Sequence, residues 1–267
     1  VLVDRLIIEN GRAVGIRFRQ NGETFEARTR GEVILCGGSI GSTQVLHRSG
    51  IGPREWLEPL GIATTLDSPG VGRNLQDHLQ QRAIYKVEGI RTLNETYYNL
   101  FRRGWMGVDY ALRRRGPLTM APSQLGIFTR SNPHQDRANI QFHVQPLSLD
   151  KFGEPLHRFP AITISACNLR PTSRGVIRLR SNGIDDAPII APNYLSTEED
   201  REVAADAIRV TRRLMKQPAL APYHPMEYLP SPSVGDDEAS LAKAAGDIGT
   251  TIFHPVGTAK MGTANDP

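Results

Sequence analysis

Two segments of the sequence carry side chains that could do chemistry. Asn74-Leu75-Gln76-Asp77-His78 places an amide, a carboxylate and an imidazole side by side after a glycine loop. The segment from Thr251 to Gly262 holds His254 directly before a proline, whose ring restricts the preceding backbone toward extended conformations. A neutral imidazole accepts a proton near neutral pH, so a histidine fixed in this way can act as a general base. The competing interpretation is structural: side-chain hydrogen bonds to the backbone can hold such loops without any chemistry.

A glycine turn is the third candidate. The apolar run Val33-Ile34-Leu35-Cys36 is predicted to be a strand buried on both faces, and it leads into Gly37-Gly38 and a helix that reaches Gly50. A buried strand, a glycine turn and a helix start form the crevice in which α/β sheets bind nucleotides. The turn is neither a P-loop nor a complete Gly-x-Gly-x-x-Gly fingerprint, so tight packing of the helix on the strand is the alternative.

Two kinds of element surround these segments. Runs over 1–8, 13–19 and 24–30, separated by Asn10-Gly11 and Asn21-Gly22, predict a β-meander with type I′ turns. The chain is loop-rich over 52–78. A helix is predicted over 94–115, where the arginines 113–115 read as a solvated helix end that complements the helix dipole.

The middle of the chain changes character. Strands are predicted over 138–145, 161–168 and 175–179. An amphipathic helix follows, with a capping box at Ser196 and Glu199, and a shorter helix covers about 237–245. Strands followed by helices indicate an α+β module distinct from the nucleotide-type start.

Composition narrows the classes of protein. The chain has 267 residues, 39% hydrophobic and 22% charged, which argues against disorder as its main state. A net charge of +4 is too small and dispersed to indicate nucleic acid, and no apolar run approaches the roughly 20 residues of a membrane helix. Cys36 and Cys167 form no metal spacing and suit a reducing compartment, so we expect no metal and a cytoplasmic location. Cys36 reads as a small buried hydrophobe.

Five segments together resemble one family. "SIGSTQVLHRSGIG" at 39–52, "GVGRNLQDH" at 70–78 and "HPVGTAKMG" at 254–262 are similar to hallmark segments of the glucose–methanol–choline (GMC) flavin oxidoreductases, in the family's order and approximate spacing. "PTSRGVIRL" at 171–179 and "PNYLSTEEDRE" at 192–202 resemble the start of its C-terminal region. The N-terminal dinucleotide fingerprint and the last family segment, which bears a second active-site His or Asn, are not in the sequence. We therefore expect a fragment that is inactive on its own.

The resemblance implies an architecture. We expect α/β plus α+β: part of an FAD-binding Rossmann-like domain, and a substrate-binding domain built on an antiparallel sheet flanked by helices. Residues 1–80 would belong to the FAD-binding domain, 81–245 to the substrate-binding domain, and 246–267 would return to the FAD-binding domain.

The resemblance also implies residue roles. Family members oxidise alcohols by hydride transfer to flavin N5 while a histidine accepts the hydroxyl proton, which assigns the base to His254 and a place beside it in the substrate pocket to Phe253. The residues expected near FAD are Val3, Gly37, Gly38, Asn74, Asp77 and His78, with a covering or structural role favoured for the last three.

Two other functions remain open on the same scaffold. One is an FAD-containing lyase of the hydroxynitrile lyase type, which keeps the cofactor and the histidine without redox chemistry. The other is a non-catalytic protein or fragment of the same fold. The sequence does not identify the alcohol or the acceptor that reoxidises the flavin.

Overall fold

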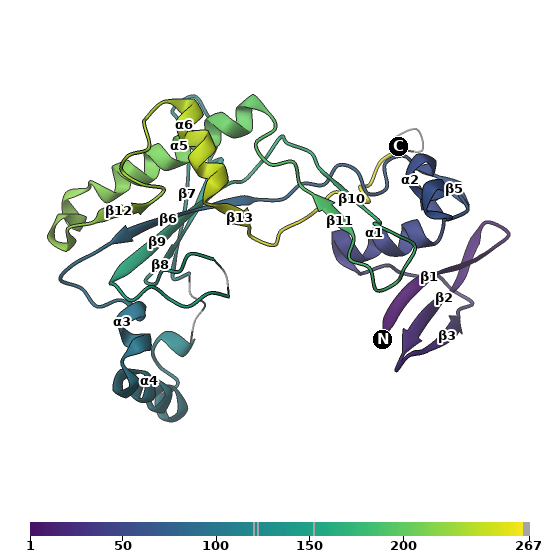
Figure 1. Cartoon of the computed structure of the whole chain (residues 1–267), viewed down its shortest axis with the longest axis horizontal. Helices are drawn as coiled ribbons and strands as arrows, with labels where there is room; N and C mark the ends of the chain where they lie inside the picture. The colour runs from purple at the N-terminus through teal and green to yellow at the C-terminus, as the bar shows by residue number, and fades with distance from the viewer. Residues whose placement is uncertain (120, 122, 152, 264–267) are drawn as a thin grey trace. The chain divides into compact units, whose positions relative to one another are not determined.

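The computed structural model describes residues 1–119, 121, 123–151 and 153–263, and the chain forms two compact units (Figure 1). The first unit comprises Val1–Asp77, Ser173–Tyr194 and the segment from Phe253 onward; the second comprises His78–Thr172 and Leu195–Ile252. The end of the predicted segment 246–267 lies outside the described residues.

The first unit begins with the predicted meander. Strands β1 (Leu2–Glu9), β2 (Arg12–Gln20) and β3 (Glu23–Arg28) pair antiparallel in sequence order. Both residues of each Asn-Gly pair have positive φ, between 51° and 86°. The two type I′ hairpins read from the sequence are therefore confirmed.

The apolar run before the glycine turn differs from the prediction. Residues 33–36 pair with no strand among the described residues; Ile34 is 78% exposed and Cys36 is also exposed. The expectations of a strand buried on both faces and of a buried Cys36 are thus wrong. The physical reason is that a central strand needs hydrogen-bonded neighbours on both sides, and the described part of the chain supplies none there. Helix α1 (Gly38–Arg48) follows the turn as predicted.

Short elements complete the first unit. Strand β4 (Ile51–Gly52) pairs parallel with β5 (Leu66–Asp67), and α2 (Arg54–Leu57) continues into the 3₁₀ turn η1 (Glu58–Leu60). Leu57 of α2 and Leu60 of η1 pack with Leu179, which follows strand β10.

Residues 173–194 lie in the first unit, whereas the sequence placed them in the substrate-binding domain. They carry β10 (Val176–Arg178) and β11 (Ile189–Ala191), which pair antiparallel. Gly175 exchanges two backbone hydrogen bonds with Leu75, with N–O distances of 2.9 and 3.0 Å. The Ile177 amide donates to the Gly72 carbonyl at 2.7 Å. These backbone contacts, between residues about a hundred positions apart, explain the correction.

A buried histidine supports the glycine loop at residues 70–72. His47 of α1 is 1% exposed, and its Nε2 lies 3.1 Å from the Val71 carbonyl oxygen. Gly72 has φ +86°, and a Cβ there would lie 2.8 Å from His47 Cε1, so the loop can rest on the ring only with glycine at this position. Burial lowers the pKa of the His47 imidazole, with a smaller contribution in the same direction from the Arg48 charge, while the Val71 hydrogen bond opposes it.

The second unit is built on one antiparallel sheet with strand order β12-β6-β9-β8-β7, and β13 pairs with β6 (Figure 1). The strands are β6 (Leu79–Lys86), β7 (Leu125–Thr129), β8 (Ile140–Gln145), β9 (Ala161–Asn168), β12 (Met226–Leu229) and β13 (Gly249–Thr251). The strands predicted over 138–145 and 161–168 correspond to β8 and β9; the one predicted over 175–179 is β10 of the first unit.

Helix α5 (Glu198–Met215) covers one face of this sheet. Val203, Ala207 and Val210 pack against Phe142 of β8 and Ile164 of β9. The N-cap is Thr197 and not the predicted Ser196; its hydroxyl accepts from the Asp200 amide at 3.3 Å. Helix α6 (Glu238–Asp247) packs on α5, and the 3₁₀ helix η3 (Pro218–Tyr223) lies between them in sequence.

The helix predicted over 94–115 is divided in two. Helix α3 (Leu93–Tyr98) ends at Asn99, whose side chain accepts from the Arg102 amide at 3.0 Å and so begins α4 (Leu100–Arg113). A short 3₁₀ turn, η2 (Pro117–Thr119), follows. Among the described residues no helix has both the length and the apolar composition that crossing a bilayer requires.

The burial of His47 generates a prediction about acid stability. Because its folded-state pKa is lowered, the unfolded chain takes up a proton below about pH 6.5 that the folded chain does not. The free energy of unfolding should therefore fall as the pH drops below 6.5, by at most about 1.4 kcal/mol per pH unit for this one group. Urea unfolding at a series of pH values should show a shallower fall in His47→Gln. Replacing the exposed His134 by Gln is the control, and equal slopes for His47→Gln and the wild type would contradict the account.

Candidate functional site

Three of the segments singled out in the sequence meet in the first unit: the start of α1, the loop 70–77 and the histidine segment 254–262. Gln76 and Val256 form an antiparallel bridge, with N–O distances of 2.9 and 2.8 Å for their two backbone hydrogen bonds. The Gly72 amide donates to the Thr258 carbonyl at 2.8 Å. The histidine segment is therefore bound to the loop along its backbone.

A buried carboxylate fixes the backbone of His254. Asp77 is 7% exposed, and its Oδ1 accepts from the His254 amide at 2.9 Å. Its Oδ2 accepts from the Tyr194 hydroxyl. Hydrogen bonds to a charged acceptor are stronger than those between neutral groups, so Asp77 is a firm anchor for the residue that precedes Pro255. Sequence reasoning missed Tyr194, since nothing in its local pattern marks a partner more than a hundred residues away.

Asn74 acts as a second brace. Its Nδ2 donates to the Gly257 carbonyl at 3.2 Å, and its Oδ1 accepts from Arg174 Nε at 3.1 Å. Gly257 has φ +93°, and a Cβ there would lie 2.5 Å from the Asn74 carbonyl oxygen, so only glycine allows this approach. Asn74 and Asp77 thus both hold the backbone of the histidine segment, and their contact with FAD stays a prediction.

The same segment is tied to the first turn of α1. Ser39 Oγ donates to the Pro255 carbonyl at 2.6 Å, and Thr258 Oγ1 donates to the Ser39 carbonyl at 2.8 Å. The hydroxyls of Thr43 and Thr258, both buried, lie 3.0 Å apart. These threonines were not singled out from the sequence; their signal is the small hydroxyl residue within two otherwise glycine-rich motifs.

His254 and Phe253 face outward from this frame. Both residues are exposed within the chain, Phe253 by 69%. Phe253 also has φ +64°, a left-handed conformation that is uncommon for a non-glycine residue and costs it about 1–3 kcal/mol. A fixed backbone with outward side chains suits a histidine that acts on a ligand.

His78 is placed differently from Asp77, its neighbour in sequence. Its ring lies in the second unit, where Nε2 is 3.2 Å from the Leu169 carbonyl oxygen. Its own carbonyl accepts from the Ile252 amide at 3.3 Å. These contacts connect the start of β6 with the ends of β9 and β13, which is a structural role.

A pocket of about 340 Å³ lies beside α1 and joins two predicted cofactor contacts, Val3 and Gly37. Its lining is mainly apolar and includes Leu2, Val33, Leu35 and Val45. A Cβ added to Gly38 would meet no atom within 4 Å, so this side of the turn is open. The first turn of α1 holds no acidic side chain, and no side chain caps it. An apolar pocket beside an unblocked helix N-terminus fits a group that has a flat apolar part and an anionic part, as FAD has.

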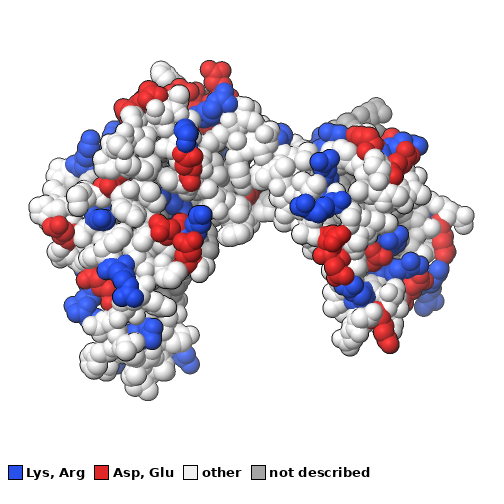
Figure 2. Space-filling view, in the orientation of Figure 1, with Lys and Arg blue, Asp and Glu red and all other residues white. Residues whose placement is uncertain are grey.

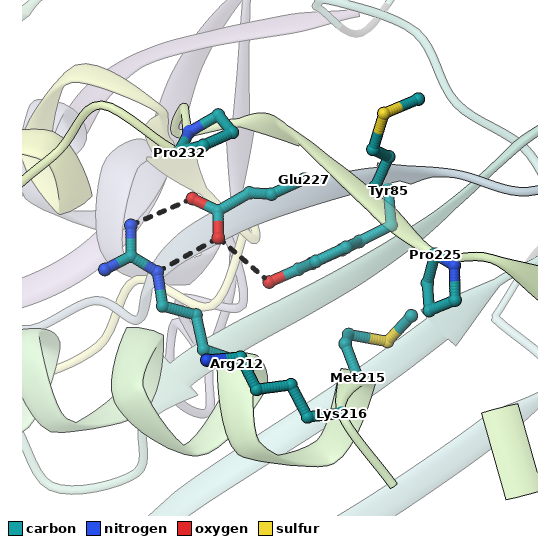
Figure 3. Close-up of a pocket in the computed structure, with 8 residues that line it drawn as sticks. Tyr85, Arg212, Met215, Lys216, Pro225, Glu227 and Pro232 are labelled. Atoms are coloured by element: carbon teal, nitrogen blue, oxygen red, sulfur yellow. Dashed lines mark hydrogen bonds and ion pairs between the residues drawn. The ribbon is translucent and has the colours of Figure 1, made fainter. Parts of the chain in front are cut away.

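A second pocket, in the second unit, is lined by charged groups that satisfy one another (Figure 3). Arg212 donates from Nε and Nη2 to the Glu227 carboxylate at 3.0 and 2.9 Å, and the Tyr85 hydroxyl donates to the same carboxylate at 3.4 Å. Burial and the Glu227 charge raise the pKa of Tyr85. Since this network joins β12 to α5 and β6, it is structural. The described residues contain no cluster of acidic, His and Cys side chains that could hold a metal.

Comparison with known proteins agrees with the sequence motifs. Family models described as GMC oxidoreductase match residues 1–80 and 171–267. The chain is 36% identical to an oxygen-dependent choline dehydrogenase of Chromohalobacter salexigens, over 98% of this chain and 46% of that protein. It is also 36% identical to an alcohol dehydrogenase [acceptor] of Pseudomonas putida, over 97% of this chain and 47% of that protein. The chain thus spans about half the length of the curated relatives it matches.

Solved structures give the same fold. Pyridoxine 4-oxidase from Mesorbium loti superimposes with a TM-score of 0.81 at 25% identity, covering 98% of this chain and 47% of that one. An Aspergillus oryzae formate oxidase superimposes with a TM-score of 0.88 at 23% identity, covering 97% and 50%. The fold class predicted from the sequence is confirmed.

The Asp77 anchor generates a prediction. Asp77→Ala should lower the free energy of unfolding by about 1–3 kcal/mol, because it removes the buried acceptor of the His254 amide. The His254 amide should also exchange faster with solvent, as measured by hydrogen–deuterium exchange. Asp77→Asn is the matched control: it keeps an oxygen for the His254 amide and a donor for the Tyr194 oxygen, so its loss should be smaller. An Asp77→Ala protein with wild-type stability and exchange would show that the anchor is unimportant.

Proposed function

The chain belongs to the GMC oxidoreductase family, and we propose that the protein containing it oxidises an alcohol with FAD as the cofactor and His254 as the general base. The substrate is a small molecule with a CH–OH group. The enzyme acts as a dehydrogenase or an oxidase, and its cytoplasmic location stays a prediction.

The observation that carries this proposal is the fixed backbone of His254. Two separate stretches of chain, the start of α1 and the loop 70–77, hold residues 254–258 through main-chain hydrogen bonds, the Ser39 hydroxyl and the buried Asp77 carboxylate. The imidazole itself is left exposed. A purely structural histidine has its ring buried and bonded, as His47 does. His254 differs from it in combining a fixed main chain with an exposed side chain, which is the arrangement that a proton acceptor needs.

Each residue then has a defined part in the chemistry. FAD, when bound, accepts the hydride from the alcohol carbon. The His254 imidazole accepts the hydroxyl proton, and the resulting alkoxide character makes the substrate a better hydride donor. Phe253 lines the substrate side next to the base. Val3, Gly37 and Gly38 would hold the cofactor along the pocket beside α1.

The names of the relatives support oxidation over the alternatives. The proteins compared above are a choline dehydrogenase, an alcohol dehydrogenase and oxidases of small molecules. The two curated relatives compared above are named for the alcohols that they oxidise, which supports a CH–OH donor for this chain. A lyase would use the same base without reducing the flavin. A primary alcohol added under anaerobic conditions therefore discriminates: loss of flavin absorbance indicates oxidation.

Replacing His254 tests the proposal. In the full-length protein, His254→Ala should retain FAD and slow flavin reduction by alcohol by about 10²–10⁴-fold, the usual loss for a general base. The free energy of unfolding should change little, because His254 is exposed and the Asp77 carboxylate bonds its backbone amide, which alanine keeps. Anaerobic stopped-flow reduction at matched FAD occupancy is the measurement.

His78→Ala serves as the control variant. Its ring bonds the Leu169 carbonyl within the second unit, so its removal should weaken folding or flavin retention more than the rate of reduction. If His254→Ala reduces the flavin at the wild-type rate while His78→Ala is inactive, the base is His78 and the proposal is refuted.

A further inference from the structure

Helix α4 carries its apolar side chains on the solvent side. Figure 1 shows α3 and α4 at the end of the second unit that lies away from α5 and α6. The exposed apolar side chains of α4 are Leu100 (72%), Phe101 (83%), Trp105 (59%), Val108 (46%) and Leu112 (79%). We call these five residues the α4 stripe. A surface helix ordinarily turns such a stripe toward the core, whereas α4 exposes its apolar face to solvent.

The α4 stripe is continuous along the helix. Phe101, Trp105, Val108 and Leu112 follow one another at spacings of four, three and four residues, which places them on one face. Met106 and Tyr110, on the opposite side, are half-buried. The apolar face of α4 is thus exposed to solvent within the chain. An exposed apolar face with two aromatic rings is typical of an interaction site.

The sequence around the α4 stripe is strongly basic. Residues 90–119 contain six arginines and only two carboxylates, Glu95 and Asp109. Glu95 is engaged in the capping box of α3, and Asp109 lies 3.7 Å from Arg113. Arg113, Arg114 and Arg115 are exposed together at the end of the helix. In Figure 2 the lobe that carries α4 shows a mostly white tip with blue groups beside it.

A pocket beside the stripe adds to this picture. It has a volume of about 300 Å³, and its lining includes the rings of Phe101 and Trp105 and the charged side chains of Arg91, Arg102 and Asp109. Two guanidinium groups next to two aromatic rings suit a phosphate that is attached to an apolar chain.

We propose that α4 docks the protein on an anionic lipid surface, with the α4 stripe at the boundary of head groups and acyl chains and the arginines at the lipid phosphates. An interfacial helix has a strong apolar face with aromatic residues, arginines or lysines beside it, and a low overall hydrophobicity, as α4 has. At 1.5 Å per residue, 14 residues extend about 21 Å, too short to cross a bilayer, so the helix lies in the plane of the surface.

The charges favour lipid over a second copy of the chain. A two-fold contact between two α4 helices would bring their arginine clusters toward one another with few carboxylates to compensate. An anionic surface instead neutralises every arginine that reaches it.

Vesicle flotation of the full-length flavoprotein tests this inference. With phosphatidylcholine vesicles that contain phosphatidylglycerol, the wild type should float, and high salt should release it. Pure phosphatidylcholine vesicles should bind it at least about tenfold more weakly. Phe101→Ser/Trp105→Ser should lower binding at least about tenfold, and Arg113→Glu/Arg114→Glu/Arg115→Glu should lower it similarly and reduce its salt dependence.

Two control variants change exposed residues of the same types elsewhere: Phe128→Ser, which is 62% exposed on β7, and Arg30→Glu. Both should float like the wild type. All variants should retain FAD and reduce it with alcohol at the wild-type rate in the absence of vesicles, which separates docking from folding and from catalysis.

Three results would overturn the proposal. The first is that the wild type does not float with anionic vesicles, a result that would also follow if another part of the full-length protein covered the stripe. The second is that the stripe and arginine variants float as well as the wild type. The third is that sedimentation velocity shows a dimer that Phe101→Ser/Trp105→Ser dissociates while no vesicle binds, which assigns the stripe to a second copy.

Discussion

The hydrogen bond from the His254 amide to the buried Asp77 carboxylate is the central contact of the network that fixes the His254 backbone in the first unit. Asp77 ends the loop that starts at Gly70, and His254 is the second residue of the segment that returns from the second unit. The bond joins residues 177 positions apart, so it holds only if both segments are placed by other contacts. The Gln76–Val256 bridge, the Asn74 brace and the Ser39–Thr258 bonds to α1 supply that placement.

These contacts explain why the motifs are rich in glycine and small hydroxyl residues. The backbone of Gly257 passes within van der Waals reach of Asn74, and that of Gly72 lies against the buried His47 ring, where any Cβ would collide. Ser39, Thr43 and Thr258 provide hydrogen bonds at a distance that longer side chains could not keep. The result is a main chain held from several sides and a histidine that is exposed within the chain. A base held in this way loses little entropy when it meets the substrate.

Local signals predicted local structure well. Asn-Gly pairs gave the two hairpins, and apolar periodicity gave α5, because turn chemistry and helical spacing lie within a few residues. Predictions that depended on distant partners failed. The run 33–36 has the composition of a buried strand but no neighbours, and 173–194 joins the first unit through Gly175 and Ile177. For the site, the motifs located His254, Asn74 and Asp77, whereas Tyr194 and the buried threonines emerge only from the fold.

The central claim is that this frame presents the His254 ring to the reacting alcohol. An experimental structure of the full-length holoprotein with a bound, unreactive alcohol analogue tests it most directly. The account predicts that a His254 ring nitrogen lies within hydrogen-bond distance of the analogue's hydroxyl oxygen, with the Asp77 carboxylate still on the His254 amide. A hydroxyl bound to another side chain, with the His254 ring turned away from it, would contradict the account.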